Sequence, residues 1–147
     1  MGIRFDEGNR IFELDTENTS YRIGIADDEG FVGHIYYGKK IRSQKCGQFL
    51  RTWEGPLVPS VNDRERCSFF DTFPTEYSGN GIGDYRESCI AVKTANGSRT
   101  VDLKYRGYDI VDGKPELAGL PSSFAGEETV NTLILHLEDK GDGLGVD

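Results

Sequence analysis

Cysteine is scarce in this sequence, and long apolar runs are absent. The three cysteines, Cys46, Cys67 and Cys89, are an odd number at spacings that match no metal-binding motif. Such a pattern favours free thiols in a reducing compartment over a disulfide framework. No run approaches the ~20 apolar residues of a membrane span, and the first residues lack the basic-then-apolar pattern of a secretory signal. We therefore expect a cytoplasmic protein that does not cross a membrane.

Positive charge is also in short supply. Lysine and arginine total 17 against 25 aspartates and glutamates, which gives a formal net charge of −8. A chain this acidic lacks the basic surface that neutralises phosphates, so nucleic acids and anionic membranes are disfavoured as partners.

The two histidines, His34 and His136, have no second ligand at zinc-site spacing. We expect both to be strand residues with satisfied hydrogen bonds, and we expect neither a metal nor a cofactor.

Helical periodicity is nearly missing as well, and alternation with a period of two takes its place. Residues 19–26 and 31–37 alternate on either side of the turn Asp27-Asp28-Glu29-Gly30, which predicts a hairpin. A second hairpin is predicted between residues 89–94 and 99–111, because Asn96-Gly97 supplies the positive φ angles of a tight turn.

A last strand is predicted over residues 129–138, where Leu133, Leu135 and Leu137 share one face. The tail after it starts another strand and stops, so the fold is expected to be truncated at its C-terminal end. With 36% hydrophobic residues, the 147 residues suffice for one core. The sequence therefore predicts one all-β domain over residues 1–147, an antiparallel β-sandwich.

Residues 43–86 alternate only weakly and are rich in glycine and proline. So long an irregular segment in a compact domain is usually functional or part of an interface. It holds the only tryptophan, Trp53, next to Glu54, with Arg66 further along. A sugar's apolar face packs on indole while its hydroxyls bind charged partners, so these residues are candidates for sugar contact. The alternative is that Trp53 fills a subunit interface and the charges form its rim.

Four segments together resemble one known family: His34–Lys39, Glu76–Arg86, Gly113–Pro121 and Glu128–Leu133. The second holds a Glu-Tyr, Gly, Asp-aromatic-Arg block, and the third holds Gly-Lys-Pro and Gly-Leu-Pro. In this order they are similar to the N-terminal domain of glycoside hydrolase family 36, the bacterial α-galactosidases. One departure is Ser78, where the family tends to carry proline.

The resemblance implies a β-supersandwich domain that precedes a (β/α)₈ barrel in a longer enzyme. That enzyme would hydrolyse terminal α-linked galactose from melibiose or raffinose with retention, using two aspartates of the barrel. A retaining pair lies roughly 5 Å apart, at the C-terminal face of a barrel. The barrel is absent from this sequence, so we expect no catalytic residue here and no activity of the chain alone.

In family 36 tetramers, a loop of this domain reaches the active site of a neighbouring subunit. By position, the resemblance assigns that role to Arg66 and Glu54, with Trp53 beside them. The expected partners are the catalytic barrel, neighbouring subunits of a homotetramer and an α-galactoside sugar. The alternative is a standalone β-sandwich that binds carbohydrate or protein.

Two further motifs are interpreted as structural. Asp84 and Arg86 are expected to fix a loop, because an arginine–carboxylate fork holds irregular backbone well. Gly113 and Gly119 are expected to serve turns that need positive φ, rather than a phosphate-binding loop.

Overall fold

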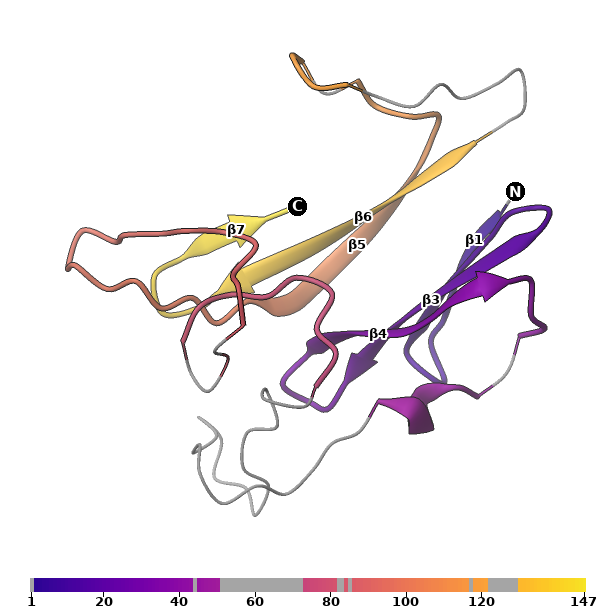
Figure 1. Cartoon of the computed structure of the whole chain (residues 1–147), viewed down its shortest axis with the longest axis horizontal. Helices are drawn as coiled ribbons and strands as arrows, with labels where there is room; N and C mark the ends of the chain where they lie inside the picture. The colour runs from indigo at the N-terminus through magenta and orange to yellow at the C-terminus, as the bar shows by residue number, and fades with distance from the viewer. Residues whose placement is uncertain are drawn as a thin grey trace.

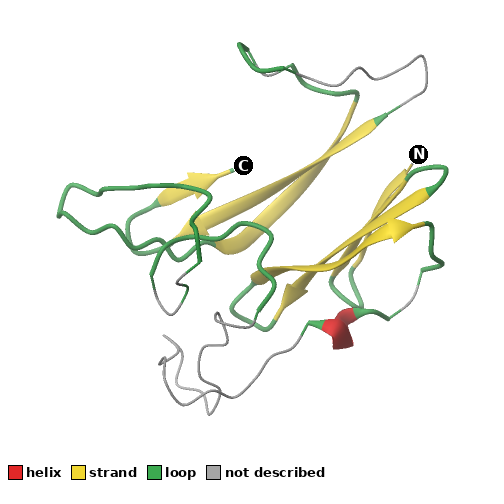
Figure 2. Ribbon diagram, viewed as in Figure 1, coloured by secondary structure: helices red, strands yellow, loops and turns green. Residues whose placement is uncertain are grey.

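The computed structural model of the chain describes residues 2–43, 45–50, 73–81, 84, 86–116, 118–121 and 130–147. Over these ranges it has two antiparallel β-sheets and a single turn of 3-10 helix (Figures 1 and 2). The predicted all-β sandwich is confirmed. In the same ranges, no helix is long and apolar enough to cross a membrane.

The first sheet is a meander of four strands in which each strand pairs with the next along the chain. Its strands are β1 (Gly2–Asp6), β2 (Ile11–Asp15), β3 (Thr19–Ala26) and β4 (Phe31–Lys39). The predicted hairpin of residues 19–26 and 31–37 is confirmed as β3 and β4. Its turn ends at Gly30, whose φ of +82° is the left-handed conformation that glycine adopts without strain.

The second sheet is a meander of three strands in the order β5-β6-β7. These strands are β5 (Lys104–Asp112), β6 (Asn131–Asp139) and β7 (Leu144–Val146). The predicted last strand corresponds to β6, and the strand start predicted in the tail is β7. The two turn glycines Gly113 and Gly119 have φ angles of +84° and +78°, as expected.

The predicted hairpin between residues 89–94 and 99–111 is wrong in its pairing and in its first strand, although its turn is present and residues 104–111 of its second strand form β5, which pairs with β6. Gly97 has a φ of +89°, and the amide of Thr94 donates to the carbonyl of Ser98 over 2.9 Å. The flanks do not pair with each other, because residues 78–80 lie between them. Cys89 donates to the carbonyl of Ser78 and Val101 to that of Asn80, each over 2.9 Å.

The main core lies between the two sheets. Its buried members are Phe12, Ile23, Ile25, Val32 and Leu137. Phe12 is completely buried, stacks on Phe5 at a centroid distance of 4.3 Å and meets the ring of Tyr108 at 5.0 Å. Burying a side chain of this size contributes roughly 1.5–3 kcal/mol, so the aromatic contacts across β2 and β5 hold the layers together.

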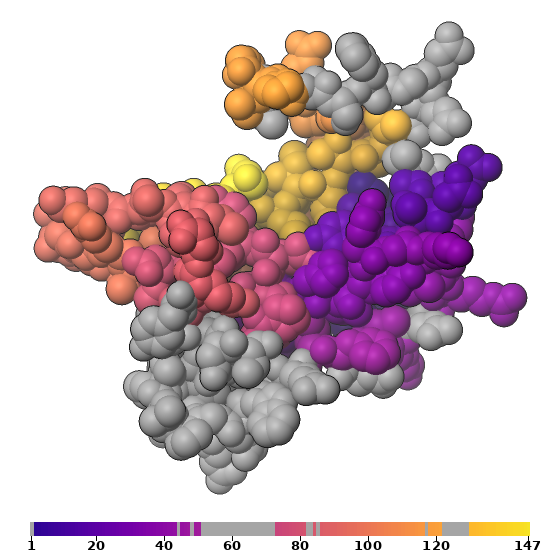
Figure 3. All heavy atoms as spheres, viewed as in Figure 1, coloured from indigo at the N-terminus to yellow at the C-terminus, as the bar shows by residue number. Residues whose placement is uncertain are grey.

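A smaller core covers the opposite face of the first sheet. It consists of Ala26, Phe31, Leu50 and Phe73, with Ile35 packed against them. Leu50 follows the helical turn η1 (Gly47–Phe49), which lies on the side of the first sheet turned away from β5 and β6 (Figure 2). In Figure 3, the pink residues that begin at Phe73 lie against the purple strands of this sheet. The first sheet is therefore covered on both faces.

Candidate functional site

The predicted sugar-contacting residues Trp53, Glu54 and Arg66 lie outside the described residues. The structure does describe the two positions that flank them, Leu50 and Phe73. Both side chains are buried in the outer core of the first sheet, Leu50 at 8% exposure and Phe73 at 0%. The described part of this region is therefore the outer face of the first sheet, on which the two flanking side chains pack.

A pair of glycines lies beneath Leu50 and Phe73. Gly24 in β3 and Gly33 in β4 are direct cross-strand partners on the outer face. A Cβ atom on Gly33 would lie 2.6 Å from Leu50 Cδ2 and 2.6 Å from Phe73 Cζ. A Cβ atom on Gly24 would lie 2.6 Å from Leu50 Cδ1 and 2.7 Å from Ile35 Cδ1. We call Gly24 and Gly33 the glycine pair; it makes the space in which Leu50 and Phe73 meet.

The residues after Phe73 are held by Arg86. Its Nη1 donates to the Phe73 carbonyl over 2.6 Å, and its Nη2 donates to Thr75 Oγ1 over 2.8 Å. Asp84 orients the guanidinium through two bonds, Nε to Oδ1 at 2.8 Å and Nη2 to Oδ2 at 2.9 Å. The expectation that Asp84 and Arg86 fix a loop is confirmed by these contacts.

Asp84 is buried, and Ser78 Oγ donates to its Oδ2 over 2.8 Å. Burial alone would raise the pKa of this carboxyl, but the hydrogen bonds from Arg86 and Ser78 outweigh it and lower the pKa below the ordinary value of 3.8. Asp84 is therefore a carboxylate at neutral pH. Ser78, the departure from the family pattern, is part of this hydrogen-bonded cluster.

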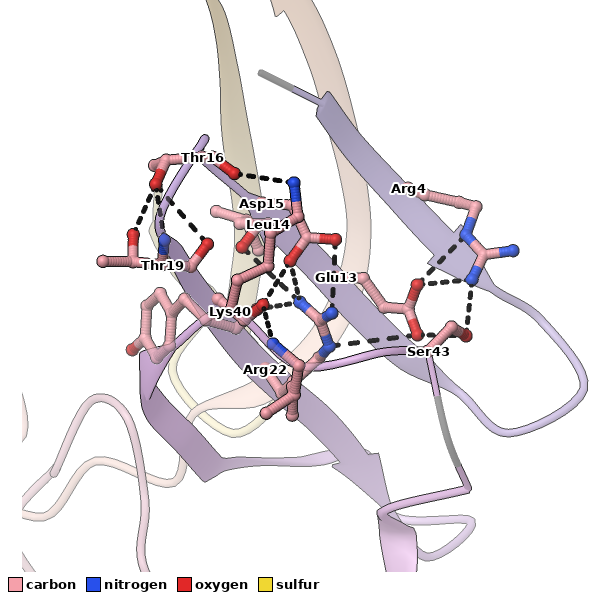
Figure 4. Close-up of polar contacts among 12 residues, drawn as sticks. Arg4, Glu13, Leu14, Asp15, Thr16, Thr19, Arg22, Lys40 and Ser43 are labelled. Atoms are coloured by element: carbon pink, nitrogen blue, oxygen red, sulfur yellow. Dashed lines mark hydrogen bonds and ion pairs between the residues drawn. The ribbon is translucent and has the colours of Figure 1, made fainter.

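The residues before Leu50 are held by a row of charges on the outer face, shown in Figure 4. Arg4, Glu13 and Arg22 are cross-strand neighbours on β1, β2 and β3. Arg22 is completely buried; its Nη1 donates to Asp15 Oδ1 over 2.9 Å, and its Nε lies 3.9 Å from Glu13 Oε1. Glu13 also forms an ion pair with Arg4 and accepts from Ser43 Oγ over 2.7 Å.

A second link ties the same segment to β3. Ser20 is completely buried, its Oγ donates to Asp15 Oδ1 over 2.6 Å and it accepts from the amide of Ile41 over 3.0 Å. The chain that leaves β4 is therefore fastened across the sheet at Ile41 and Ser43. Opposite charges side by side on neighbouring strands stabilise such a surface.

A separate cluster surrounds Glu76 on the inner face. Tyr21 donates to one carboxylate oxygen, and His34 Nδ1 lies 3.0 Å from the other. Burial and the bond to Glu76 raise the pKa of Tyr21 above its ordinary value of 10. Tyr37, which is 69% exposed, meets Tyr21 edge to face. His34 is thus a hydrogen-bonded strand residue, as the sequence predicts.

Between the sheets near Glu76 lies a cleft of about 560 Å³. Its walls are mainly aliphatic and include Ile23, Val32, Leu133, Leu135, Leu137 and Val146. Pockets for small molecules are mostly apolar but present a few converging polar groups. Both carboxylate oxygens of Glu76 are already bonded to Tyr21 and His34, so these walls fit another apolar surface better than a sugar.

Potential metal ligands do not gather into a cluster in the part of the chain that the structure describes. Within it, no group of three or more histidine, cysteine, aspartate or glutamate side chains could hold an ion. His136 contacts two carboxylates, Asp109 and Asp147, at 3.0 Å and 2.6 Å. These three residues lie on or beside the second sheet, and they form hydrogen bonds instead of an ion site.

The glycine pair was not singled out from the sequence, although a signal for it exists. Glycine weakens a strand interior, so a glycine inside an alternating strand indicates a close approach of another part of the chain. Gly24 and Gly33 both interrupt alternating strands. What the sequence could not tell is which residues approach them.

Comparison with known proteins gives consistent matches over the chain. Residues 30–147 match the glycosyl hydrolase family 36 N-terminal domain. The chain is 36% identical over 143 residues to alpha-galactosidase Mel36A of Lactobacillus acidophilus, covering 94% of this chain and 19% of that protein. It is 32% identical to the bifunctional alpha-galactosidase/sucrose kinase AgaSK of Mediterraneibacter gnavus, covering 95% of this chain and 15% of that protein.

Solved structures agree with the sequence matches. The galactosidase domain of AgaSK superposes with a TM-score of 0.83 at 31% identity, over 96% of this chain and 20% of that chain. A variant of alpha-galactosidase AgaA from Geobacillus stearothermophilus, in complex with raffinose, superposes with a TM-score of 0.78 at 30% identity, over 92% of this chain and 19% of that chain. The chain thus spans a fifth or less of the length of these relatives.

Proposed function

Because the chain belongs to the glycosyl hydrolase family 36 N-terminal domain family, we propose that it is the non-catalytic N-terminal domain of an α-galactosidase. The parent enzyme would release terminal α-linked galactose from melibiose- and raffinose-type sugars with retention. The observation that carries the proposal is the match to Mel36A over 94% of this chain. The two catalytic aspartates would belong to a catalytic barrel outside this chain, so the chain alone would be inactive.

The proposed contribution of this domain is a wall of the active site. Arg66 and Glu54, with Trp53 beside them, would contact the sugar bound by a neighbouring subunit of a cytoplasmic homotetramer. An indole can pack on the apolar face of a sugar, and a guanidinium offers a fork of donors to its hydroxyls. The catalytic barrel and the neighbouring subunits would be the protein partners.

The test uses the full-length enzyme and the substrate melibiose. Removing one charged hydrogen-bonding partner costs about 1.5–3 kcal/mol, which corresponds to roughly ten- to a hundredfold. Arg66→Ala should lower kcat/KM by that factor while sedimentation still gives a tetramer. Wild-type kinetics in a tetrameric Arg66→Ala enzyme would contradict the proposed role of this segment. Release of galactose by the chain alone, abolished by mutating one of its own carboxylates, would contradict the non-catalytic assignment.

The second candidate function is a standalone β-sandwich that binds carbohydrate or protein. The apolar cleft favours a protein ligand, and the exposed ring of Tyr37 favours a carbohydrate ligand. The two functions differ in one measurable property. A standalone module should bind galactosides without the barrel, whereas the proposed wall of an active site should bind them only in the assembled enzyme.

A further inference from the structure

The turn at residues 94–98 carries an Asn-Gly pair, and both Asn96 and Gly97 are exposed. Asparagine is a chemically labile residue, because the backbone nitrogen that follows it can attack its side-chain carbonyl and close a succinimide ring. Attack within one chain profits from the proximity of the two groups. A following glycine leaves the attacking nitrogen unshielded, and the Cβ position of Gly97 has nothing within 4 Å.

We propose that Asn96 is a site of spontaneous deamidation that the fold itself promotes. The turn presents two hydrogen-bond donors to the side-chain oxygen on which negative charge develops during the attack. The inference is independent of the proposed function, because it concerns the chemistry of one described turn and involves neither a sugar nor a second subunit.

Both donors contact Asn96 Oδ1. The amide of Ser98 donates to it over 2.9 Å, and the hydroxyl of Thr94 donates to it over 2.5 Å. A backbone N–H can only donate, so the atom that faces Ser98 is the oxygen of the side-chain amide and not its nitrogen. Donors that already point at an atom that becomes negatively charged stabilise the charge without reorganisation, as in an oxyanion hole.

The reaction needs only water as a second reactant. First, the Gly97 nitrogen forms a bond with Asn96 Cγ, and negative charge develops on Oδ1. The Cγ–Nδ2 bond then breaks, and the NH2 group leaves as ammonia with the proton that the Gly97 nitrogen gives up. Water next opens the succinimide: its hydroxyl adds to one ring carbonyl and its hydrogen returns to the ring nitrogen. Opening at Cγ gives aspartate, and opening at the main-chain carbonyl gives isoaspartate.

A second Asn-Gly pair, Asn80-Gly81, provides a control within the same molecule. The Asn80 side chain donates from Nδ2 to the carbonyl of Arg99 over 3.2 Å, and no described residue donates to its Oδ1. Its glycine is also crowded, because a Cβ atom on Gly81 would lie 2.5 Å from Thr100 Cγ2. The same dipeptide therefore lacks both features that favour attack at Asn96.

The experiment incubates the chain at neutral pH and follows both sites by peptide mapping with mass spectrometry. Replacement of NH2 by OH raises the mass of the peptide, and chromatography separates its isoaspartate form from its aspartate form. A favourably placed oxyanion donor changes a rate by tenfold or more, so we expect Asn96 to deamidate about tenfold faster than Asn80 in the folded chain. In urea the two rates should converge, because the turn is lost.

Thr94→Val tests the hydroxyl donor alone. It removes the bond to Asn96 Oδ1 but keeps the backbone bond from the amide of residue 94 to the carbonyl of Ser98. We expect the rate at Asn96 to fall by about tenfold, and Thr94→Ser to retain the wild-type rate. The matched control is Ser98→Ala, which removes a hydroxyl of the same turn that contacts Thr100 instead of Asn96. It should leave the rate unchanged.

Two results would overturn the inference. If the ratio of the two rates is near one in the folded chain, or is the same in urea, the fold does not promote the reaction at Asn96. If Thr94→Val deamidates as fast as the wild type, the donors do not activate the side chain. Neither result bears on the proposed α-galactosidase assignment, which the kinetics of Arg66→Ala test separately.

Discussion

Arg22 shows how a buried charge is held within the first sheet. It is completely buried, and its charge is matched by Asp15 and by the buried Glu13. Removing one partner of such a group leaves uncompensated charge in the interior, which is far more costly than removing a whole pair.

We expect Arg22→Met to lower the free energy of unfolding by roughly 3–5 kcal/mol, measured by urea denaturation. The matched control is Arg106→Met. Arg106 forms an exposed pair with Glu138 on the second sheet, and exposed pairs contribute about 0–1 kcal/mol. An equal loss of unfolding free energy in the two variants would show that burial does not determine how much each ion pair contributes to stability.

His136 is a second residue whose charge depends on its neighbours. Hydrogen bonds from its ring to Asp147 and Asp109 raise its pKa above the ordinary 6.5. A raised pKa in the folded state means that protonation favours folding: the contribution is complete below pH 6.5 and is lost as the pH rises through the folded-state pKa. We expect Asp109→Asn to lower the pKa of His136 in an NMR titration of the ring. An unchanged pKa would indicate that Asp109 does not interact with it.

At this scale, the sequence predicts pairings better than it predicts packing. The role of Asp84 and Arg86 in holding a loop follows from their chemistry, because a guanidinium and a carboxylate two residues apart can form a bidentate ion pair. The glycine pair depends on Leu50 and Phe73, which are distant in sequence, so its partners require the fold. The roles of Trp53, Glu54 and Arg66 stay predictions.

At the scale of elements, the turn between β3 and β4 joins the two sheets. The carbonyl of Gly30 accepts from the amide of Tyr105 over 2.8 Å. A Cβ atom on Gly30 would lie 3.3 Å from the Tyr105 carbonyl oxygen. The turn therefore needs glycine for its positive φ and also for the close approach of β5.

We expect Gly30→Ala to destabilise the fold by more than Gly97→Ala. Gly97 has a similar φ of +89° but open space around its Cβ position, so its substitution costs only the left-handed conformation, roughly 1–2 kcal/mol. The difference between the two free energies of unfolding measures the contact with β5. An equal loss of unfolding free energy in the two variants would mean that the contact between Gly30 and β5 does not contribute to stability.

Strand prediction succeeded where alternation was long. It failed where tertiary contacts determine which segments form hydrogen bonds with each other. The β3–β4 hairpin has two long alternating runs and a glycine turn, so local signals suffice. The alternating runs on either side of Gly97 have the same sequence pattern. They nevertheless form backbone hydrogen bonds with residues 78–80 and not with each other. No hairpin was predicted for β1 and β2, which are only five residues each and include charged side chains.

At the scale of the whole molecule, the aliphatic cleft between the sheets is open. Apolar surfaces of this kind mark interaction sites or promote association. We therefore expect the chain by itself to self-associate in sedimentation velocity, and Val146→Lys to reduce the association. Leu120→Lys is the control, because Leu120 is 63% exposed outside the cleft and the charge change is identical. A monomeric wild-type chain at high concentration would contradict this expectation.

Within each sheet every strand pairs with its neighbour in sequence, and this order also has a consequence during synthesis. The four strands of the first sheet pair with one another within residues 2–39, and in the described part of the chain only β4 shares further backbone hydrogen bonds, with residues 74–76, whereas the residues that cover the inner face come mainly from β5 and β6. About 100 residues separate Lys39 from the end of β6, and a ribosome adds roughly 5–20 residues per second. A nascent meander with Phe12, Ile23 and Ile25 uncovered would therefore persist for about 5–20 s, long enough for a chaperone to bind it before the sandwich closes.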